Sequence, residues 1–146
     1  MIEILVVIAL FAIILGLGLF VGFDFYKNYS FRSEESTIVS VLQKARNQSL
    51  NNINQTRHGV HFEQGQYIIF QCPALTPQCT SYTAGPEDNP INSSYGVTIN
   101  PLPLDIVFDQ LNGDCVSCQS SDIVITASDG VKSYNISINT EGRISW

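Results

Sequence analysis

The sequence predicts an α+β protein: a long N-terminal α-helix packed on a β-rich globular head that forms an antiparallel sheet or a small β-sandwich. Two observations lead to this prediction. Residues 25–54 contain neither Pro nor Gly and carry apolar side chains at roughly helical spacing, whereas residues 57–146 alternate short apolar segments with turn residues. The 146 residues of the chain correspond to the length of one domain.

An uncharged apolar run, residues 4–23, is long enough to cross a bilayer as a helix. A cleaved signal peptide is the alternative, but it requires a basic segment, a shorter apolar core and a small-residue cleavage site, none of which is present. Glu3 precedes the run, and an interfacial aromatic group at residues 24–27 follows it. We therefore expect a retained transmembrane helix over residues 1–24.

A second helical segment, residues 25–56, is expected to continue this helix to about residue 54. Its apolar positions predict one buried face: Phe31, Ile38, Val41, Leu42, Ala45 and Ile53. The whole helix would be about 80 Å long at 1.5 Å per residue. Gly16, Gly18 and Gly22 lower the helix propensity and allow close helix packing, so they are candidates for local melting or for a packing site.

The head, residues 57–146, is expected to consist of short strands. A compact turn at residues 63–66 predicts one hairpin, and Ser128-Asp129-Gly130 predicts another. Long loops rich in Pro, Thr, Ser, Asn and Gly occupy much of residues 72–103. In chain order, the predicted strands are residues 60–62, 67–70, 95–99, 104–108, 122–127, 131–138 and 143–146.

The four cysteines are the most chemically distinctive residues of the head. Their even number favours disulfides in an oxidising environment, and we expect the two local bridges, Cys72–Cys79 and Cys115–Cys118, among three possible connectivities. Structural zinc is an alternative because Cys115 and Cys118 have the spacing of a metal knuckle, but Cys72 and Cys79 do not. A redox site is a further alternative, although Cys115 and Cys118 lack its helical setting.

Apart from the cysteines, the chain carries no recognisable motif for catalysis, metal binding or cofactor binding. It contains no nucleophile elbow, phosphate-binding loop or zinc-protease motif. His58 and His61 lie three apart in a predicted strand, so their side chains should point to opposite faces and not share an ion. We therefore expect no enzyme activity, no metal site and no cofactor.

Composition argues against nucleic acid as a partner. The net charge is −6, and only 7 residues are Lys or Arg, whereas binding to a phosphate backbone needs many basic side chains. We expect five of these seven basic residues on the part of the helix that follows the apolar run, here called the lower helix: Lys27, Arg32, Lys44, Arg46 and Arg57. Because the head is acidic, the helix of one subunit could meet the head of another, or these could be ordinary solvated charges.

The N-terminal segment carries a family resemblance. The residues Met1-Ile-Glu-Ile-Leu-Val-Val-Ile-Ala-Leu10, followed by a long apolar helix and a strand-rich head, resemble type IV pilins and the pseudopilins of type II secretion. The segments Leu42-Gln-Lys-Ala-Arg-Asn-Gln-Ser49, Gly59-Val-His-Phe62 and Ile136-Ser-Ile-Asn-Thr-Glu-Gly-Arg-Ile144 resemble H-type minor pseudopilins and FimT-type minor pilins. The resemblance covers about half of the chain.

The resemblance implies specific roles in assembly. Glu3 would neutralise the N-terminal amine of a neighbouring subunit, and the apolar helix would form the filament core. Core residues implied in this way are Ile4, Leu5, Val6, Val7, Ile8, Leu10 and Phe11. The implied partners are copies of the chain or other pilins, a prepilin peptidase, an inner-membrane assembly platform, and the membrane before assembly; the family's N-terminus is methylated.

We therefore expect a structural subunit that polymerises into a type IV pilus-like filament by packing of its N-terminal helices. The alternative is a minor tip or priming pseudopilin, or a membrane-tethered binding module that contacts a secreted protein, a surface or DNA. A tethered periplasmic metal or redox protein is a third possibility. The expected location is the inner membrane, with a single pass and an extracytoplasmic head, followed by an extracellular pilus or a periplasmic pseudopilus.

Overall fold

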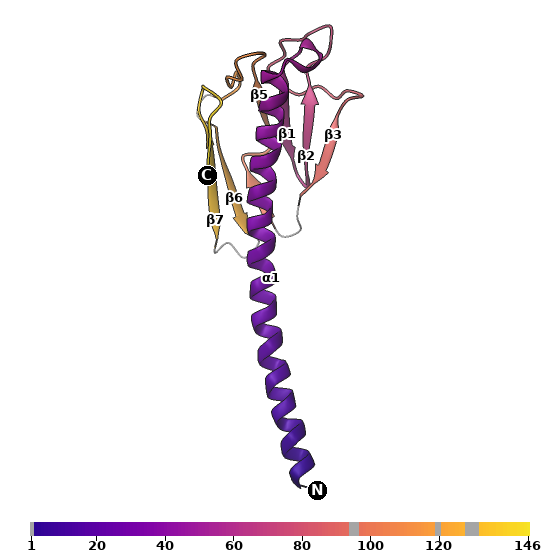
Figure 1. Ribbon diagram of the computed structural model, residues 1–146, viewed down its shortest axis with the longest axis vertical. Coiled ribbons are helices and arrows are strands. Elements are labelled where there is room, and N and C mark those ends of the chain that lie inside the picture. The colour runs from indigo at the N-terminus through magenta and orange to yellow at the C-terminus, as the bar shows by residue number, and fades with distance from the viewer. Residues whose placement is uncertain (1, 94–96, 119–120, 128–131) are drawn as a thin grey trace. The chain divides into compact units, whose positions relative to one another are not determined.

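The computed structural model describes residues 2–93, 97–118, 121–127 and 132–146. Over these residues the chain is α+β, with a long helix, α1 (Ile2–Leu50), and two antiparallel sheets (Figure 1). The chain divides into two compact units, Met1–Ser33 and Glu34–Trp146. The predicted fold class is thus confirmed as an N-terminal helix followed by antiparallel sheets.

The N-terminal part of α1 does not bear out the predicted transmembrane helix. In the part of the chain that the structure describes, no helix is both long enough and apolar enough to cross a bilayer. The predicted single-pass location in the inner membrane is therefore wrong.

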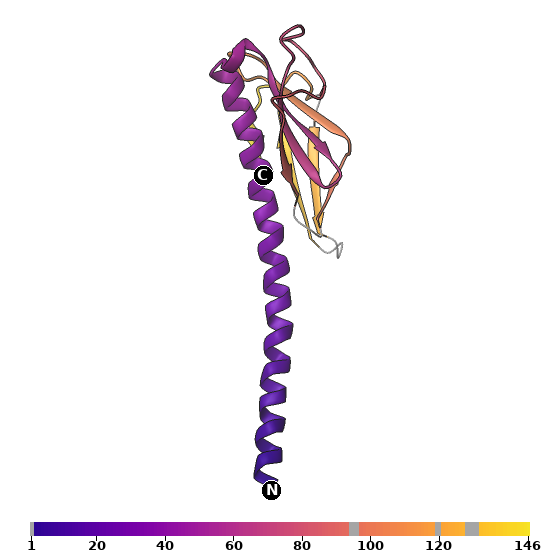
Figure 2. The same ribbon diagram turned by 90° about the vertical axis from the view of Figure 1, so that its right-hand side faces the viewer.

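The helix α1 ends at Leu50, earlier than the predicted end near residue 54. Asn52 and Asn54 both have a left-handed φ of 53°, a conformation that asparagine tolerates because its side chain can bond locally. A 3₁₀ turn, η1 (Ile53–Gln55), lies there before the chain turns back into the first strand (Figure 2). Ile53 therefore lies outside the helix and is 44% exposed, which corrects its predicted place on the buried face.

The first sheet has the strand order β3-β2-β1-β5, with each pair antiparallel. Its strands are β1 (His58–Glu63), β2 (Gln66–Gln71), β3 (Asn89–Asn92) and β5 (Leu104–Phe108). Strands β1 and β2 form the predicted hairpin, in which Gly65 has a φ of 89° that side-chain-bearing residues rarely adopt. The predicted segments 60–62, 67–70 and 104–108 are thus confirmed as strands.

Strand β3 lies in a region for which the sequence predicts only loops. Its Pro90 pairs with Ile68 of β2. Because β3 is at the edge of the sheet, proline's missing N–H does not interrupt a ladder with a further strand. A proline-containing segment therefore forms a strand here only because β2 offers it an edge.

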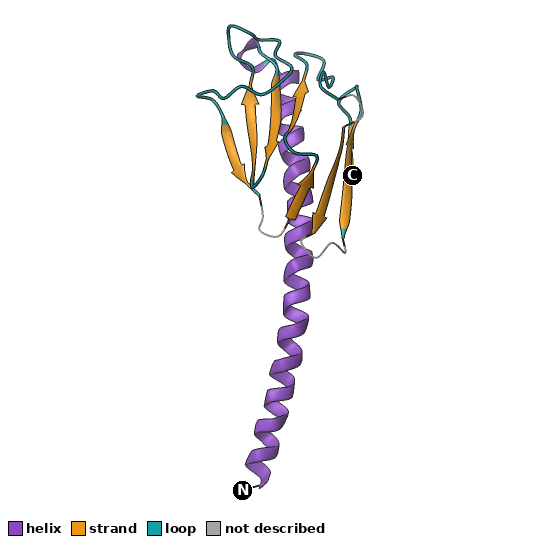
Figure 3. Ribbon diagram, turned by 180° about the vertical axis from the view of Figure 1, so that it is seen from behind, coloured by secondary structure: helices purple, strands orange, loops and turns teal. Residues whose placement is uncertain are grey.

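The second sheet has the strand order β4-β6-β7-β8 and is also antiparallel (Figure 3). Its strands are β4 (Val97–Asn100), β6 (Ser121–Ala127), β7 (Ser133–Ile138) and β8 (Ile144–Ser145). These agree with the four remaining predicted strands, with small shifts of their ends. The predicted turn at residues 128–130, residue 131, and residues 95–96 of a predicted strand lie outside the described residues.

The buried side chains of Glu34–Trp146 come from the helix and from both sheets. Its side chains with no exposed surface include Ile38, Leu42, Val60, Phe62, Tyr67, Ile106, Phe108, Ile123 and Ile136. The helical positions Ile38, Val41, Leu42 and Ala45 of this unit are buried, as their spacing predicts, and Phe31, which belongs to Met1–Ser33, is buried too. Removal of these apolar side chains from water supplies the main favourable term in folding.

Ser49, on the last turn of α1, bonds to two strands at once. Its fully buried hydroxyl accepts the backbone N–H of His58 at 2.9 Å and donates to the carbonyl of Phe108 at 3.0 Å. His58 and Phe108 are Cα partners in the β1–β5 ladder. The backbone carbonyl of Ser49 also accepts the N–H of Leu111 at 3.1 Å. One residue therefore fixes the helix end against β1, β5 and the following loop.

The substitution Ser49→Ala is expected to lower the free energy of unfolding by about 1–3 kcal/mol, because the buried N–H of His58 loses its acceptor. Chemical denaturation followed by circular dichroism measures this change. Ser40→Ala is the matched control, since the exposed hydroxyl of Ser40 bonds only to Thr37 of the same helix. Equal stability of the two variants would contradict the role assigned to Ser49.

Candidate functional site

The first turns of α1 present the predicted assembly residues to solvent. Glu3 is exposed in the first turn, where the positive end of the helix dipole favours a carboxylate. The predicted core residues are each between 51% and 68% exposed: Ile4, Leu5, Val6, Val7, Ile8, Leu10 and Phe11. Because these residues are nearly consecutive, they lie on every side of the helix. An exposed apolar surface therefore surrounds this segment.

The helix α1 remains helical at the three glycines for which the sequence predicts flexibility or packing, Gly16, Gly18 and Gly22. A Cβ atom added at Gly16 would meet nothing within 4 Å. The missing side chain at Gly16 therefore leaves room for the close approach of another helix. A role of these glycines in local melting stays a prediction.

Both predicted disulfides are present in the head. Cys72 is bonded to Cys79 with a Cα–Cα distance of 5.5 Å, and Cys115 to Cys118 with a Cα–Cα distance of 5.4 Å. All four sulfur atoms are therefore in disulfides, and none is the thiolate that a zinc site requires. Each disulfide therefore closes one short loop of the head.

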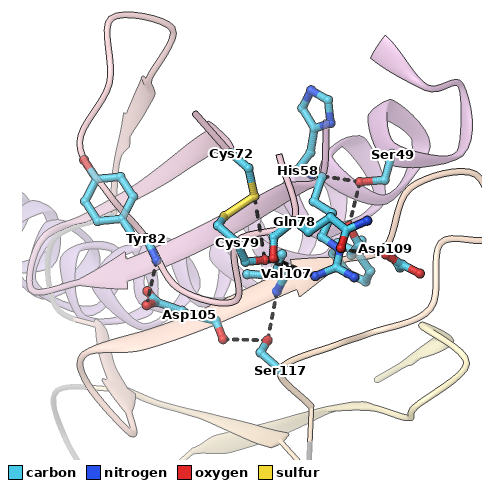
Figure 4. The surroundings of a disulfide bond; sticks show 12 residues. Ser49, His58, Cys72, Gln78, Cys79, Tyr82, Asp105, Val107, Asp109 and Ser117 are labelled. Atoms are coloured by element: carbon cyan, nitrogen blue, oxygen red, sulfur yellow. Dashed lines mark hydrogen bonds and ion pairs between the residues drawn. A yellow bond between two sulfur atoms is a disulfide. The ribbon is translucent and has the colours of Figure 1, made fainter. Parts of the chain in front are cut away.

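Arg57 fastens the Cys72–Cys79 loop to the first sheet. Its Nε lies 2.6 Å from Oδ1 of Asp109, and its Nη1 donates to the carbonyl of Gln78 at 2.9 Å. Its backbone carbonyl accepts the N–H of Cys72 at 2.9 Å. Figure 4 shows Gln78 and Asp109 beside this disulfide. Arg57 thus belongs to the head and not to the lower helix, which corrects its predicted place.

Asp105 of β5 holds a second loop against the sheet. Its Oδ1 lies 2.5 Å from Nδ1 of His61, and its Oδ2 accepts the backbone N–H of Tyr82 at 3.0 Å (Figure 4). The rings of His61 and Tyr82 stack with their centroids 4.3 Å apart. On the other side, Nε2 of His61 lies 3.8 Å from Oε2 of Glu63. One imidazole is thus bracketed by two carboxylates and an aromatic ring.

The hydroxyl of Tyr82 stays protonated and completes this cluster. Burial, followed by the hydrogen bond and charge of Asp88 and the charges of Glu63 and Asp105, raises the pKa of Tyr82 to about 12. The hydroxyl donates to Oδ2 of Asp88 at 2.8 Å, and the same oxygen accepts the N–H of Gly85 at 2.9 Å. These bonds give the polar loop after Cys79 a defined conformation.

Ser117 attaches the Cys115–Cys118 loop to β5. Its hydroxyl donates to the carbonyl of Asp105 at 2.9 Å and accepts the N–H of Val107 at 2.9 Å (Figure 4). The side chain therefore satisfies two backbone groups of β5 that would otherwise face a loop. Both disulfide loops are in this way bonded to the same sheet.

Arg46 joins the helix to two glycine turns. Its Nε donates to the carbonyl of Gly113 at 3.2 Å, and its Nη2 donates to the carbonyl of Glu141 at 3.2 Å. Gly113 and Gly142 have φ angles of 70° and 68°, and a Cβ atom on Gly142 would lie only 2.0 Å from the Gly113 carbonyl oxygen. Arg46 therefore bonds to the backbone of both turns of the head.

His58 is the first residue of β1, and its side chain is buried, with 2% of its surface exposed. Burial lowers the pKa of His58. A hydrogen bond with the backbone of Thr56 acts in the opposite direction but has a smaller effect. His58 and His61 have separate surroundings. Among the described residues, no group of three or more His, Cys, Asp or Glu side chains could hold a metal ion.

The residues that hold the loops of the head were not predicted from the sequence. They include Arg46, Ser49, Arg57, Asp105 and Ser117. Four of their bonds join residues between 44 and 67 positions apart in the chain. Local spacing carries no signal for such contacts, because the bonded residues lie far apart in the chain.

Similarity to known proteins does not identify the function of this chain. No family model, curated protein or solved structure matches it. The resemblance to pilins therefore rests on the quoted motifs, chiefly the N-terminal segment that contains Glu3.

The substitution Arg57→Met is expected to release the Cys72–Cys79 loop, because it removes the bonds to Asp109 and Gln78. Amide hydrogen exchange of residues 73–78 should accelerate, and the free energy of unfolding should fall by about 1–3 kcal/mol. Arg143→Met, at an exposed arginine of the head, is the matched control. Unchanged exchange in the loop of the Arg57 variant would refute this assignment.

The stability of the head is expected to fall as the pH drops below about 6.5, the ordinary pKa of histidine. Because His58 has a lowered pKa in the folded state, the unfolded chain binds the proton first, and stability rises with pH across this window. Urea denaturation at several pH values measures the effect. His58→Gln should flatten the pH dependence, and an identical slope in both proteins would show that His58 is not its source.

Proposed function

We propose that this chain is a structural subunit of a type IV pilus-like filament, which polymerises with copies of itself or with similar subunits through its N-terminal helix. The observation that carries the proposal is the apolar surface of α1 between residues 2 and 17. Twelve large apolar side chains there are more than half exposed: Ile2, Ile4, Leu5, Val6, Val7, Ile8, Leu10, Phe11, Ile13, Ile14, Leu15 and Leu17.

A helix that is apolar on all sides is stable only when its whole surface is covered. Full burial of one such side chain contributes about 1.5–3 kcal/mol, so twelve of them form a strong driving force for association. Helices of neighbouring subunits offer the same surface and can cover one another. Gly16 supports this arrangement, since it allows two helices to approach closely.

Glu3 fixes the axial register between neighbouring helices in this apolar contact. A carboxylate that leaves water on assembly requires a positively charged partner, because an unpaired buried charge is costly. By resemblance to pilins, that partner is the N-terminal amine of the neighbouring subunit. Only one axial displacement between the helices brings these two groups together.

The rest of the helix is proposed to cover the head and not to join the assembly surface. Ile38, Val41, Leu42 and Ala45 are buried, and Ser49 and Arg46 bond to backbone groups of the strands and loops. These contacts support a helix packed on the sheets in Glu34–Trp146. Among the described side chains of the helix, twelve exposed large apolar ones lie between residues 2 and 17, and Phe25, Tyr26 and Tyr29 are exposed as well.

Phe11→Glu is expected to abolish filament formation by the full-length chain, because it places a charge within the apolar contact. The protein is purified in detergent, the detergent is removed, and assembly is measured by sedimentation and electron microscopy. Leu75→Glu is the matched control, because Leu75 is 96% exposed in the Cys72–Cys79 loop. It should assemble like the original protein.

Glu3→Ala tests register separately from hydrophobic contact. This variant keeps every apolar side chain but should reduce incorporation into filaments roughly tenfold, which corresponds to about 1.4 kcal/mol. Normal incorporation of Glu3→Ala would eliminate the register role. Normal assembly of Phe11→Glu, or loss of assembly in Leu75→Glu alone, would overturn the proposed function.

A further inference from the structure

Three loops of Glu34–Trp146 lie together at the end of the unit where α1 finishes (Figure 1). They are residues 51–56, 73–78 and 110–112, here called the uncharged loop surface. None of these residues is Asp, Glu, Lys or Arg, whereas the whole chain has a net charge of −6. The charged side chains of the chain thus leave this surface to apolar and neutral polar groups.

Hydrogen bonds hold the three loops together. The backbone N–H of Arg57, directly after the first loop, donates to the carbonyl of Pro77 in the second at 3.1 Å. Nε2 of Gln110 in the third loop donates to Oδ1 of Asn52 in the first. The Cys72–Cys79 disulfide closes the second loop. Because the loops are ordered in advance, a partner binds them without the entropic cost of ordering them.

Each of the three loops presents one large apolar side chain to solvent. Ile53 is 44% exposed, Leu111 is 65% exposed and Leu75 is 96% exposed. The centre of a protein–protein interface is poor in charged residues and buries apolar side chains. The uncharged loop surface has both of these properties.

The backbone of this surface is strained. Among the described residues, the four that are not glycine and have a left-handed φ are Asn52, Asn54, Gln55 and Leu111, and all four belong to it. Asparagine tolerates this conformation, but Leu111, with a φ of 71°, has no polar side chain that could bond locally. Strain of this kind collects at functional sites, so the exposure of Leu111 points to a contact with a partner.

The polar side chains of the surface favour a second copy of the same surface as that partner. Its exposed amides are Asn51, Asn54, Gln55, Gln78 and Asn112. An amide both donates and accepts hydrogen bonds, so amides can pair with the same amides of another copy. Carboxylates or ammonium groups could not pair in this way, because like charges repel each other.

The charges around the surface favour the same partner. Arg57 and Asp109, which adjoin the first and third loops, pair with each other at 2.6 Å, and Asp114 is exposed just beyond the third loop. Two copies, each with a net charge of −6, repel each other wherever acidic surfaces meet, and least where these uncharged loops meet. Without Lys or Arg, the loops offer nothing to nucleic acid or to an anionic membrane.

We propose that two copies of this chain bind each other through the uncharged loop surface and form a symmetric dimer. The apolar side chains of Leu75 and Leu111 are buried in this contact, and the amides of the two copies pair around them. The three loops comprise fifteen residues, fewer than the roughly 20–30 residues a side of a stable interface. The dimer is therefore weak, with a Kd of roughly 10–100 µM. This contact is separate from the helix packing proposed for filament assembly.

The test uses the whole chain with the Phe11→Glu substitution, which removes the contact between N-terminal helices, in a density-matched detergent. Sedimentation equilibrium between roughly 5 and 500 µM protein brackets the expected Kd. Amide hydrogen exchange at the lowest and highest concentrations locates the contact. Exchange should become slower with concentration in residues 51–56, 73–78 and 110–112.

Two further substitutions are each added to this Phe11→Glu chain. Leu75→Glu is expected to raise the Kd of the dimer about tenfold or more, because it places a carboxylate in the contact on both copies. Leu111→Asn is expected to raise it about tenfold through the loss of apolar contact on both copies. Since asparagine tolerates the left-handed backbone, Leu111→Asn should not lower the free energy of unfolding. Trp146→Gln is the matched control, because Trp146 is also 65% exposed but lies outside this surface, and it should leave the Kd unchanged.

Three results would overturn the proposal. In the first, the chain stays monomeric at every concentration. In the second, it dimerises, but Leu75→Glu and Leu111→Asn dimerise as well as Trp146→Gln, so that the contact lies elsewhere. In the third, the chain stays monomeric but cosediments with phosphatidylcholine vesicles through Leu75, so that the surface contacts lipid. None of these results decides whether the N-terminal helices form filaments, because Leu75→Glu without the Phe11 substitution is tested for assembly separately.

Discussion

The hydrogen bonds of the Ser49 hydroxyl are the contact on which the arrangement of the head depends. One buried oxygen bonds to the first residue of β1 and to the last residue of β5, and so ties the end of the helix to the ladder that these strands share. The chain must then reverse between Leu50 and His58, which it does through the left-handed backbone of Asn52 and Asn54. Strand β1, with which both β2 and β5 pair, begins directly after this reversal.

The same short stretch positions the first disulfide loop. Arg57, at the end of the reversal, donates to the carbonyl of Gln78 in that loop. His58, the next residue, donates its backbone N–H to Ser49, and its side chain is buried.

Local patterns in the sequence predicted much of the fold. The hairpin around Gly65, the strand at Leu104–Phe108, the buried helical positions and both disulfides follow from periodicity, turn residues or short spacing. Long-range contacts were not accessible in this way: β3 contains Pro90 and forms only because β2 offers it an edge, and Asp105 meets His61 across 44 positions. The apolar N-terminal run was correctly predicted to be helical, but its predicted membrane crossing was wrong.

The two disulfides close very short segments, with sequence separations of 7 and 3. The loss of chain entropy that a crosslink imposes on the unfolded state grows with the length of the closed loop, so each of these bonds restricts the unfolded chain less than a crosslink over a long loop does. In the reduced chain each cysteine also remains near its correct partner, which keeps the effective concentration of that partner high. Oxidative folding of the head therefore needs little search among the wrong pairings.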